Sequence, residues 1–223
     1  TQFRSSAASD VYKRQPCSRV LALHFFMNLL NKKIKNLNIK LASKSPRRQE
    51  LLRNIIEDFK IVTKDVEEEY PKDLKANEIA LYLAKLKANS YLKESKENEL
   101  YITADTIVVY NNKVLGKPID PKDAFRMLKE LSGNTHTVYT GVSLLLNGEI
   151  NSFLDSTEVS FYNLSDEEIT FYINHYKPMD KAGSYGIQEW MGYVGIRKIK
   201  GDFFNVMGLP LHKLYREIEK IAF

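Results

Sequence analysis

A β-hairpin in the second half of the chain limits the possible folds most strongly. Two runs rich in β-branched and aromatic residues, 137–146 and 149–162, are separated only by Asn147-Gly148. An Asn-Gly pair favours the two-residue turn between antiparallel strands, because both residues tolerate a positive φ. We therefore predict two long antiparallel strands here, and the fold must contain a sheet.

Helices and strands alternate along the rest of the chain. Capping residues mark several helix starts, among them Ser45 before Pro46, Asp120 before Pro121, and Ser165 with Glu168 as a capping box. Periodicity predicts further strands at 39–42, 59–62, 100–110, 113–115, 192–199 and 203–207, and helices at about 46–56, 77–91, 121–132, 166–176 and 211–221. No repeat or interdomain linker interrupts this order. The pattern predicts an α/β protein with a mixed, strongly twisted sheet flanked by helices.

Overall charge gives little indication of a macromolecular partner. The chain has 33 basic and 28 acidic residues, a net charge of +5, and its first 26 residues hold four of the basic and one of the acidic residues. The remainder therefore carries only +2, which indicates neither nucleic acid nor an anionic membrane as partner. At 43% hydrophobic and 27% charged residues, the composition is that of a globular protein.

The first 26 residues differ from the rest of the chain. Residues 1–15 lack apolar periodicity, so we predict that 1–26 is a non-native or disordered extension and that 27–223 forms a single domain beginning at Met27. The apolar run 20–30 has no small-residue cleavage site and is too short to span a bilayer. The only cysteine, Cys17, falls in this extension, which leaves the domain without thiol chemistry and fits a cytoplasmic protein.

The stretch Ser43-Lys44-Ser45-Pro46-Arg47-Arg48 indicates a phosphate site. It joins a short apolar run to a helical pattern, so it places the unpaired N–H groups of a helix start beside two hydroxyls and two guanidinium groups. That concentration of donors suits a di- or triphosphate. A capped surface helix with solvated arginines, or a kinase site in a flexible segment, is the structural alternative, although the preceding apolar strand argues against flexibility.

Several other residues are candidates for chemistry, each with an ordinary structural alternative. Asp105 interrupts the apolar run 100–110, and a buried carboxylate requires a cation or metal nearby. Glu68 lies in the acidic run 65–69, while Lys87 on a helix and Lys117 in Gly-Lys-Pro can face either a phosphate or water. For each of these residues, the sequence alone allows either a role in a functional site or an ordinary structural or solvent-exposed role.

Two further segments suggest a base pocket or a proton carrier. The loop 182–188 contains Tyr185, whose ring can stack on a base, and Gln188, whose amide can pair with a base edge, although a tight turn packed by Tyr185 would look the same. His136 opens a strand and is either a general base or, more commonly for such a residue, a structural hydrogen-bonding group. A P-loop motif and histidine pairs at zinc spacing are both lacking from the sequence.

Taken together and in order, these segments resemble the Maf family of nucleoside triphosphate pyrophosphatases. The resemblance extends from residue 39 to the last helix, and its order is far more specific than any single piece. The matching segments are Ser43–Arg48, Glu68, Leu83-Ala84 with Lys87-Ala88, Ala104-Asp105-Thr106, Gly116-Lys117-Pro118, Leu131-Ser132-Gly133, Asp180–Gly183, Tyr185–Gln188 and Gly208–Leu211.

The resemblance implies a fold similar to inosine triphosphate pyrophosphatases, with two lobes around a deep cleft. It implies hydrolysis of a nucleoside triphosphate to the monophosphate and pyrophosphate with a divalent cation, Mg²⁺ or Mn²⁺, as a way of cleaning the nucleotide pool. A homodimer is also suggested. Partners other than the nucleotide, such as nucleic acid or a membrane, are not expected.

The resemblance also assigns roles within the site. Asp105 is expected as general base or metal ligand and Glu68 as a second metal ligand. The phosphates are expected to contact Arg47, Lys87, Lys117 and the helix start with Ser43, Ser45 and Arg48. Thr106 and Gln188 are expected to influence the choice of base.

Motif details favour the branch of the family that acts on dTTP, UTP and modified pyrimidine triphosphates. The chain resembles this branch in three features: the two arginines after Ser-Pro, the Asp105-Thr106 pair, and the Gly-Ile-Gln loop that ends at Gln188. Glu189 departs from it, because glycine is usual at that position. The alternatives are the 7-methyl-GTP branch, which tends to carry an aromatic residue in the Ser-Pro motif and Asp-Gln in the strand, and a non-enzymatic nucleotide-binding regulator of cell division.

Overall fold

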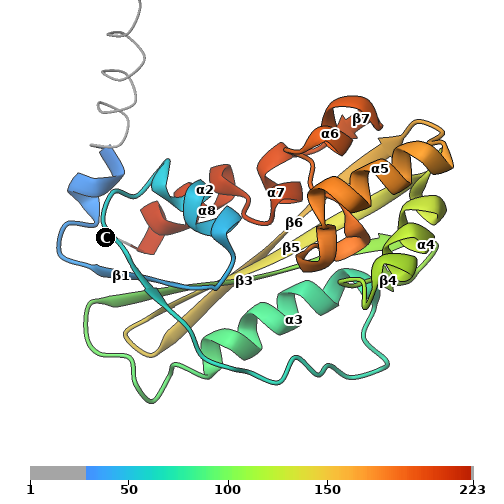
Figure 1. Ribbon diagram of the computed structural model, residues 1–223. Coiled ribbons are helices and arrows are strands. Elements are labelled where there is room, and N and C mark those ends of the chain that lie inside the picture. Colours follow the sequence, from blue (N-terminus) through green and yellow to red (C-terminus); the bar gives the residue numbers. More distant parts are fainter. Residues whose placement is uncertain (1–28, 222–223) are drawn as a thin grey trace, which may run out of the picture.

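A mixed seven-stranded sheet forms the centre of the molecule (Figure 1). The computed structural model describes residues 29–221, so the predicted extension and the Met27 start lie outside the described residues. The strand order is β2-β1-β3-β5-β6-β7, with β4 also paired to β3. The strands are β1 (Asn38–Ala42), β2 (Lys60–Val62), β3 (Glu99–Tyr110), β4 (Lys113–Leu115), β5 (Thr135–Leu146), β6 (Glu149–Phe161) and β7 (Ile196–Lys200).

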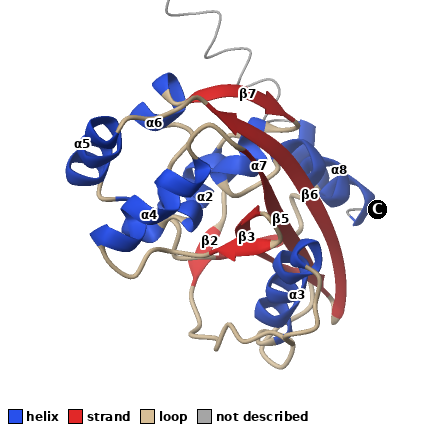
Figure 2. Ribbon diagram, turned by 90° about the vertical axis from the view of Figure 1, so that its right-hand side faces the viewer, coloured by secondary structure: helices blue, strands red, loops and turns tan. Residues whose placement is uncertain are grey.

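The predicted hairpin is confirmed as the antiparallel pair β5 and β6. Asn147 and Gly148 have φ values of 51° and 83°, as a turn with two left-handed residues requires. β3 pairs antiparallel with β5 on one side and parallel with β1 on the other. The mixed, twisted sheet flanked by helices is therefore confirmed (Figure 2).

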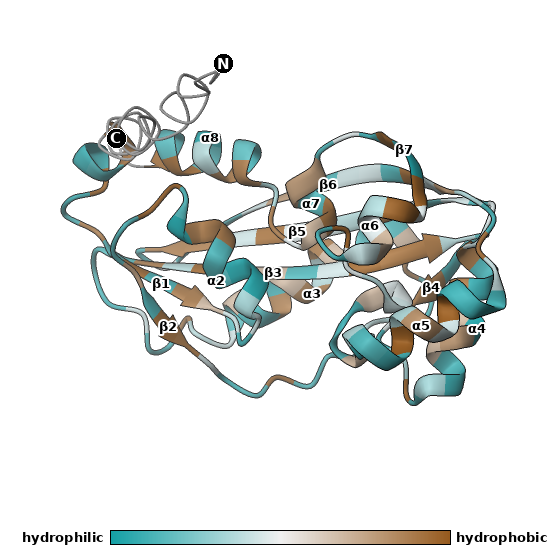
Figure 3. Cartoon of the chain, turned by 45° about the horizontal axis from the view of Figure 1, so that its top comes forward, coloured by the Kyte–Doolittle hydropathy of each residue, from teal (hydrophilic) through white to brown (hydrophobic). Residues whose placement is uncertain are grey.

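Helices cover both faces of the sheet (Figure 2). α3 (Ala76–Asn89) packs on one face, against β3, β5 and β6. The other face carries α2 (Pro46–Arg53), α4 (Pro121–Leu131), α5 (Asp166–Tyr176), α7 (Phe203–Met207) and α8 (Leu211–Ile221), which contribute to two buried hydrophobic clusters. α8 alternates between hydrophilic and hydrophobic residues along its length, as a helix with one buried side does (Figure 3).

One edge of β3 is left open between two neighbouring strands. β1 pairs with residues 99–102 of β3, and β4 pairs with residues 108–110, so residues 103–107 have no partner strand on that edge. The loop after β1 and the loop after β4 border this gap. The register of the sheet therefore brings the Ser43–Arg48 segment and Lys117 beside the middle of β3.

One predicted strand, 203–207, is wrong, and another, 192–199, is confirmed only in its second half. Residues 203–207 form α7, and residues 192–194 belong to α6 (Trp190–Val194), so that only 196–200 forms a strand, β7. The side chain of Asp202 accepts a hydrogen bond from the Asn205 backbone and caps α7, while the Asn205 amide donates to the Val138 carbonyl on β5. These contacts outweigh the strand preference of Phe203 and Phe204.

Two predictions about the whole domain are not tested by this arrangement. The two lobes around a deep cleft, and the extent of the single domain over 27–223, stay predictions. Among residues 29–221, no helix is both long and apolar enough to cross a membrane.

Candidate functional site

Two adjoining cavities open at the gap beside β3, with volumes of about 340 and 360 Å³. Each residue that the family resemblance assigns to the site lines at least one of the two cavities. The first cavity is lined by Ser45, Arg47, Arg48, Glu68, Lys87, Asp105, Thr106, Lys117 and Gln188, and the second shares six of these and adds Ser43. The segments that meet here are separated by more than a hundred residues in the sequence.

Asp105 lies at the middle of the open edge and is paired with α3. The Lys87 ammonium group donates to Asp105 Oδ1 at 2.5 Å and lies 2.9 Å from Glu68 Oε1. The prediction that a buried Asp105 requires a nearby cation is confirmed. Burial of Glu68 opposes ionisation, but the hydrogen bond from Lys87 and the charges around it lower the pKa of Glu68 below its usual value.

The Ser-Pro segment forms the helix start that its sequence predicts. Ser45 is the N-cap of α2, with its side chain accepting from the Arg48 backbone, and Pro46 follows in the first turn. Ser43 Oγ accepts a hydrogen bond from the Ser45 backbone N–H at 3.2 Å. The positive end of α2 therefore borders the second cavity.

Arg48 joins three parts of the chain. Its guanidinium nitrogens donate to the Gly208 carbonyl at 2.8 Å, the Ala104 carbonyl at 2.9 Å and Thr106 Oγ1 at 2.9 Å. Burial lowers the pKa of Arg48 from its usual range, although the nearby Asp105 carboxylate opposes that effect. Most of its donors are thus used within the protein, where they connect α2 to β3 and to the end of α7.

Arg47 is held by an acidic residue to which the sequence alone assigned no role. Its guanidinium donates to Asp180 Oδ2 at 2.6 Å, and the Lys181 ammonium donates to Asp180 Oδ1 at 2.9 Å. Burial of Asp180 opposes ionisation, but these two hydrogen bonds lower its pKa to about 2. Asp180 and Lys181 both line the first cavity, and only the family pattern around 180–183 could have indicated them.

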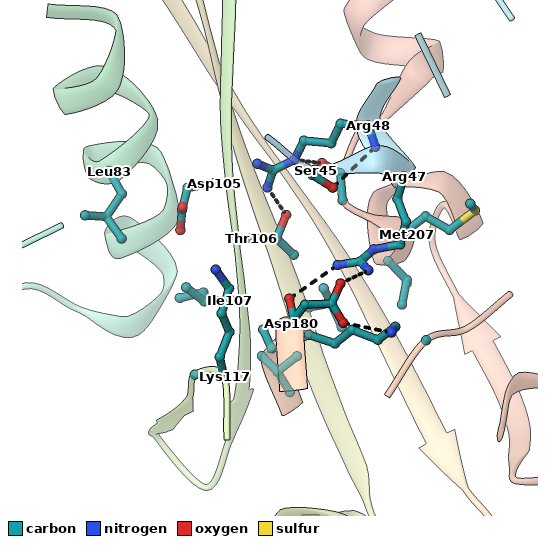
Figure 4. Close-up of a pocket in the computed structure, with 18 of the residues that line it drawn as sticks. Ser45, Arg47, Arg48, Leu83, Asp105, Thr106, Ile107, Lys117, Asp180 and Met207 are labelled. Atoms are coloured by element: carbon teal, nitrogen blue, oxygen red, sulfur yellow. Dashed lines mark hydrogen bonds and ion pairs between the residues drawn. The ribbon is translucent and has the colours of Figure 1, made fainter. Parts of the chain in front are cut away.

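Lys117 approaches the same cavity from the loop after β4. Its side chain points toward Asp105 (Figure 4). Among the described residues, the Lys117 ammonium forms no ion pair or hydrogen bond, and it is exposed to solvent. Its charge is therefore available to an anion that enters the cavity.

The residues expected to contact the base differ in whether their polar groups already form hydrogen bonds within the protein. Gln188 is half-buried and lines the first cavity, whereas Thr106 Oγ1 accepts from Arg48 and lies 3.0 Å from Thr140 Oγ1. Glu189 lines neither cavity, and its carboxylate pairs with Lys181 at 3.1 Å and accepts from the Tyr172 hydroxyl.

His136 and Tyr185 are hydrogen-bonded to each other. His136 Nε2 lies 2.7 Å from the Tyr185 hydroxyl, and both side chains are buried. Burial lowers the pKa of His136 to about 3, so the imidazole is neutral at ordinary pH. His136 borders neither cavity, which favours a structural role over that of a general base. Tyr185 packs within the turn and is 5% exposed, but it also lines the first cavity, so a contact with a base stays a prediction.

Comparison with known proteins assigns this chain to a family. The family model described as Maf-like protein matches residues 38–221. The chain belongs to the Maf family. Among curated relatives of this Maf protein, the dTTP/UTP pyrophosphatase of Flavobacterium johnsoniae is 51% identical over 87% of this chain and all of the relative. The dTTP/UTP pyrophosphatase of Phocaeicola vulgatus is 54% identical over 81% of this chain and 94% of the relative.

A solved structure shares the fold of this Maf protein. The Staphylococcus aureus Ham1 protein superimposes with a TM-score of 0.50 and 15% identity, over 82% of this chain and 99% of that protein. The similarity concerns the fold alone. The predicted mixed sheet flanked by helices agrees with it.

Proposed function

We propose that this Maf family protein hydrolyses nucleoside triphosphates, dTTP and UTP foremost, to the monophosphate and pyrophosphate. One observation supports this most directly. Asp105 faces a cavity into which cations from three separate elements converge: Arg47 from α2, Lys87 from α3 and Lys117 from the loop after β4. The names of the two relatives agree with such an activity.

The lining of the cavities suits a nucleotide in both charge and polarity. In the first cavity five cationic side chains face three carboxylates, and in the second six cationic side chains face three carboxylates. This excess of positive charge favours a triphosphate. The first cavity also contains apolar side chains that can cover a base and sugar, namely Leu83, Ile107, Val108, Val114, Val138, Val206 and Met207.

In the proposed reaction, a water oxygen attacks the α-phosphorus and the bond from that phosphorus to the bridging oxygen breaks. Pyrophosphate leaves, and the proton of the water passes to the Asp105 carboxylate. Arg47, Lys87 and Lys117 stabilise the negative charge that develops on the phosphate oxygens. Because Lys87 already pairs with Asp105, it also orients the carboxylate before the substrate binds.

Glu68 and Asp105 suit a divalent cation such as Mg²⁺ or Mn²⁺. Both carboxylates reach the same ammonium nitrogen of Lys87, at 2.9 and 2.5 Å, so they lie close enough to share one ion. Two carboxylates completed by phosphate oxygens and water are a usual environment for Mg²⁺. When bound, such an ion polarises the phosphoryl oxygen and lowers the pKa of an attacking water.

Gln188 is the residue that we expect to select the base. Its amide has a donor and an acceptor that can pair with the edge of a pyrimidine, and it lines the cavity. The Thr106 hydroxyl, by contrast, is already bonded to Arg48, so its influence on the base passes through the position of that arginine. A homodimer and a cytoplasmic role in removing unwanted nucleotides complete the proposal.

The test is an assay of the full chain with single triphosphates and Mg²⁺ or Mn²⁺. We expect pyrophosphate and the monophosphate from dTTP and UTP, with weaker turnover of 7-methyl-GTP. Asp105→Asn is expected to lower kcat by about 100-fold or more, given the usual contribution of a general base. Release of orthophosphate would contradict the reaction, and full activity of Asp105→Asn would contradict the role of that residue.

Two other outcomes would support the alternatives. Preferred turnover of 7-methyl-GTP would place the protein in the other enzymatic branch. Nucleotide binding without any turnover in the same assay would favour a regulatory protein.

A further inference from the structure

A second group of potential metal ligands lies outside both cavities. Asp155 on β6, Asp202 at the start of α7 and His212 in the first turn of α8 offer ligand atoms that all lie within 4.8 Å of one another. None of the three lines either cavity. The strand, the short helix and the last helix meet at this point on the face opposite α3.

A buried carboxylate oxygen in this group lacks a hydrogen-bond partner. Asp155 is 8% exposed, and its Oδ2 has no hydrogen-bond partner among the described residues. Its other oxygen, Oδ1, accepts from the Lys213 ammonium at 2.5 Å. An unsatisfied buried acceptor is destabilising, and a bound cation would remove that penalty.

The His212 ring lies between the two carboxylates. His212 Nε2 is 4.0 Å from Asp155 Oδ2, and His212 Nδ1 is 3.5 Å from Asp202 Oδ2. Ligands bound at about 2.0 to 2.2 Å to one zinc ion lie roughly 3 to 3.5 Å apart. Only one ring nitrogen can bind the ion, and with one ligand atom from each residue the three atoms lie within 4.8 Å of one another, so the imidazole must turn to bring that nitrogen to both carboxylates. The His212 side chain is 55% exposed and therefore has room to turn.

Hydrogen bonding already orients the Asp202 carboxylate. Its Oδ2 accepts from the Asn205 backbone N–H at 2.8 Å, as the cap of α7. Carboxylates that bind metals are commonly held by such additional hydrogen bonds. The site therefore contains one oriented carboxylate, one buried carboxylate with a free oxygen, and one imidazole that solvent can reach.

We propose that Asp155, Asp202 and His212 form a second metal site, which takes a divalent transition metal ion of the zinc type. The imidazole ligand favours zinc over Mg²⁺ or Ca²⁺, which prefer ligand sets made only of oxygen. Three protein ligands leave a position for water. Because Lys213 balances one of the two carboxylate charges, the site suits a single divalent ion.

An ion at this site would hold together three elements whose ligands are distant in sequence. The segment from Asp202 to His212 contains Val206, Met207 and Gly208, which line the first cavity. The ion would therefore restrain the far side of the nucleotide cavity without contacting a nucleotide. Binding requires the folded chain, so the ion stabilises the protein.

The test is to titrate the full chain with zinc and to measure the stoichiometry and affinity of binding by calorimetry. Mg²⁺ is present in large excess to occupy Glu68 and Asp105. We expect His212→Ala and Asp155→Asn each to bind one equivalent fewer than the wild type. His175→Ala, which removes an exposed histidine on α5, is the matched control and should bind as the wild type does. Zinc at about 100 times its Kd should raise the wild-type Tm by about 5 °C, but not that of His212→Ala.

The comparison between variants decides the result, because Cys17 and His24, outside the described residues, can also bind zinc. Unchanged zinc stoichiometry and affinity in His212→Ala would overturn the proposal. This variant removes an exposed ring, so it remains decisive even where Asp155→Asn fails to fold. The readout is zinc binding rather than hydrolysis, so its result is independent of the proposed activity.

Discussion

The pairing of Lys87 with Asp105 is the central interaction at the scale of single residues. Both side chains are mostly buried, with 17% and 11% of their surface exposed. A charged carboxylate in the middle of an apolar strand is tolerated because this ammonium group compensates for it. The two residues are 18 positions apart, on different elements.

We predict that Lys87→Met lowers the free energy of unfolding by about 2 to 3 kcal/mol, because it leaves the Asp105 charge uncompensated. Adding Asp105→Asn to that variant should restore much of the loss. Urea unfolding of the two single variants and the double variant measures the coupling. Lys64→Met breaks the exposed pair with Glu94 and serves as control, with an expected loss below about 1 kcal/mol. Equal losses in the two lysine variants would refute the prediction.

His136 should make the protein sensitive to mild acid. The unfolded chain binds the proton near pH 6.5, but the folded chain binds it only near pH 3, so acid favours unfolding across that window. Stability should fall by up to about 1.4 kcal/mol per pH unit below pH 6.5. Asp180, whose pKa is about 2 when folded, adds to this loss only once the pH falls below about 4.

The check is to follow urea unfolding between pH 7 and pH 4.5 for the wild type and for His136→Gln. Glutamine can still hydrogen-bond to the Tyr185 hydroxyl but takes up no proton. We expect a shallower decline in the variant, whatever its stability at pH 7. Parallel curves would mean that another group carries the acid sensitivity.

At the scale of elements, strand alternation explains how two neighbouring residues contact different helices. Successive side chains of β3 point to opposite faces of the sheet. Asp105 therefore meets Lys87 of α3, and Thr106 meets Arg48 of α2 on the other face. Because residues 103–107 have an open edge, both side chains also border the same cavity.

The close approach of α3 to the sheet depends on Gly141 of β5. A Cβ atom at this position would lie 2.3 Å from the Ala80 carbonyl oxygen, on the backbone of α3. We predict that Gly141→Ala displaces α3 and destabilises the protein by about 1 to 3 kcal/mol. Hydrolysis should fall as well, because α3 carries Lys87.

Thermal unfolding and the hydrolysis assay together measure this effect. Gly148→Asn in the β5–β6 turn is the matched control, since nothing lies within 4 Å of its Cβ position and asparagine tolerates the positive φ of 83°. A Gly141→Ala protein as stable and active as Gly148→Asn would contradict the proposed role of this contact.

At the scale of the whole molecule, the cavities exist only when distant segments are folded together. A non-hydrolysable α,β-imido analogue of dTTP with Mg²⁺ should therefore stabilise the folded chain by mass action. At about 100 times its Kd it should raise the Tm by about 5 °C. Lys117→Met should reduce this rise without lowering the Tm of the free protein, since Lys117 has no ion pair among the described residues. Lys113→Met replaces an exposed lysine on β4 and should respond as the wild type does.

The sequence predicted which residues border the cavities better than it predicted which of those residues contact one another. Every predicted site residue borders one of the two cavities, and the order of motifs indicated the family to which the chain belongs. The roles of these residues stay predictions. The engagement of Arg48 within the chain and the pairing of Arg47 with Asp180 were not predicted. Neither pairing has a signature in local sequence.

By itself, the sequence determined the features that depend on nearby residues: the Ser45 cap, the Asn147-Gly148 turn and the alternation of β3. Only the tertiary structure decided that 203–207 is a helix and which charged groups pair. The reason is the separation in sequence between the residues that form each contact. A cap or a two-residue turn is formed within about four residues. The bonds from Arg48 to Thr106 and from Arg47 to Asp180 join residues 58 and 133 positions apart, so they exist only once the sheet has set its register.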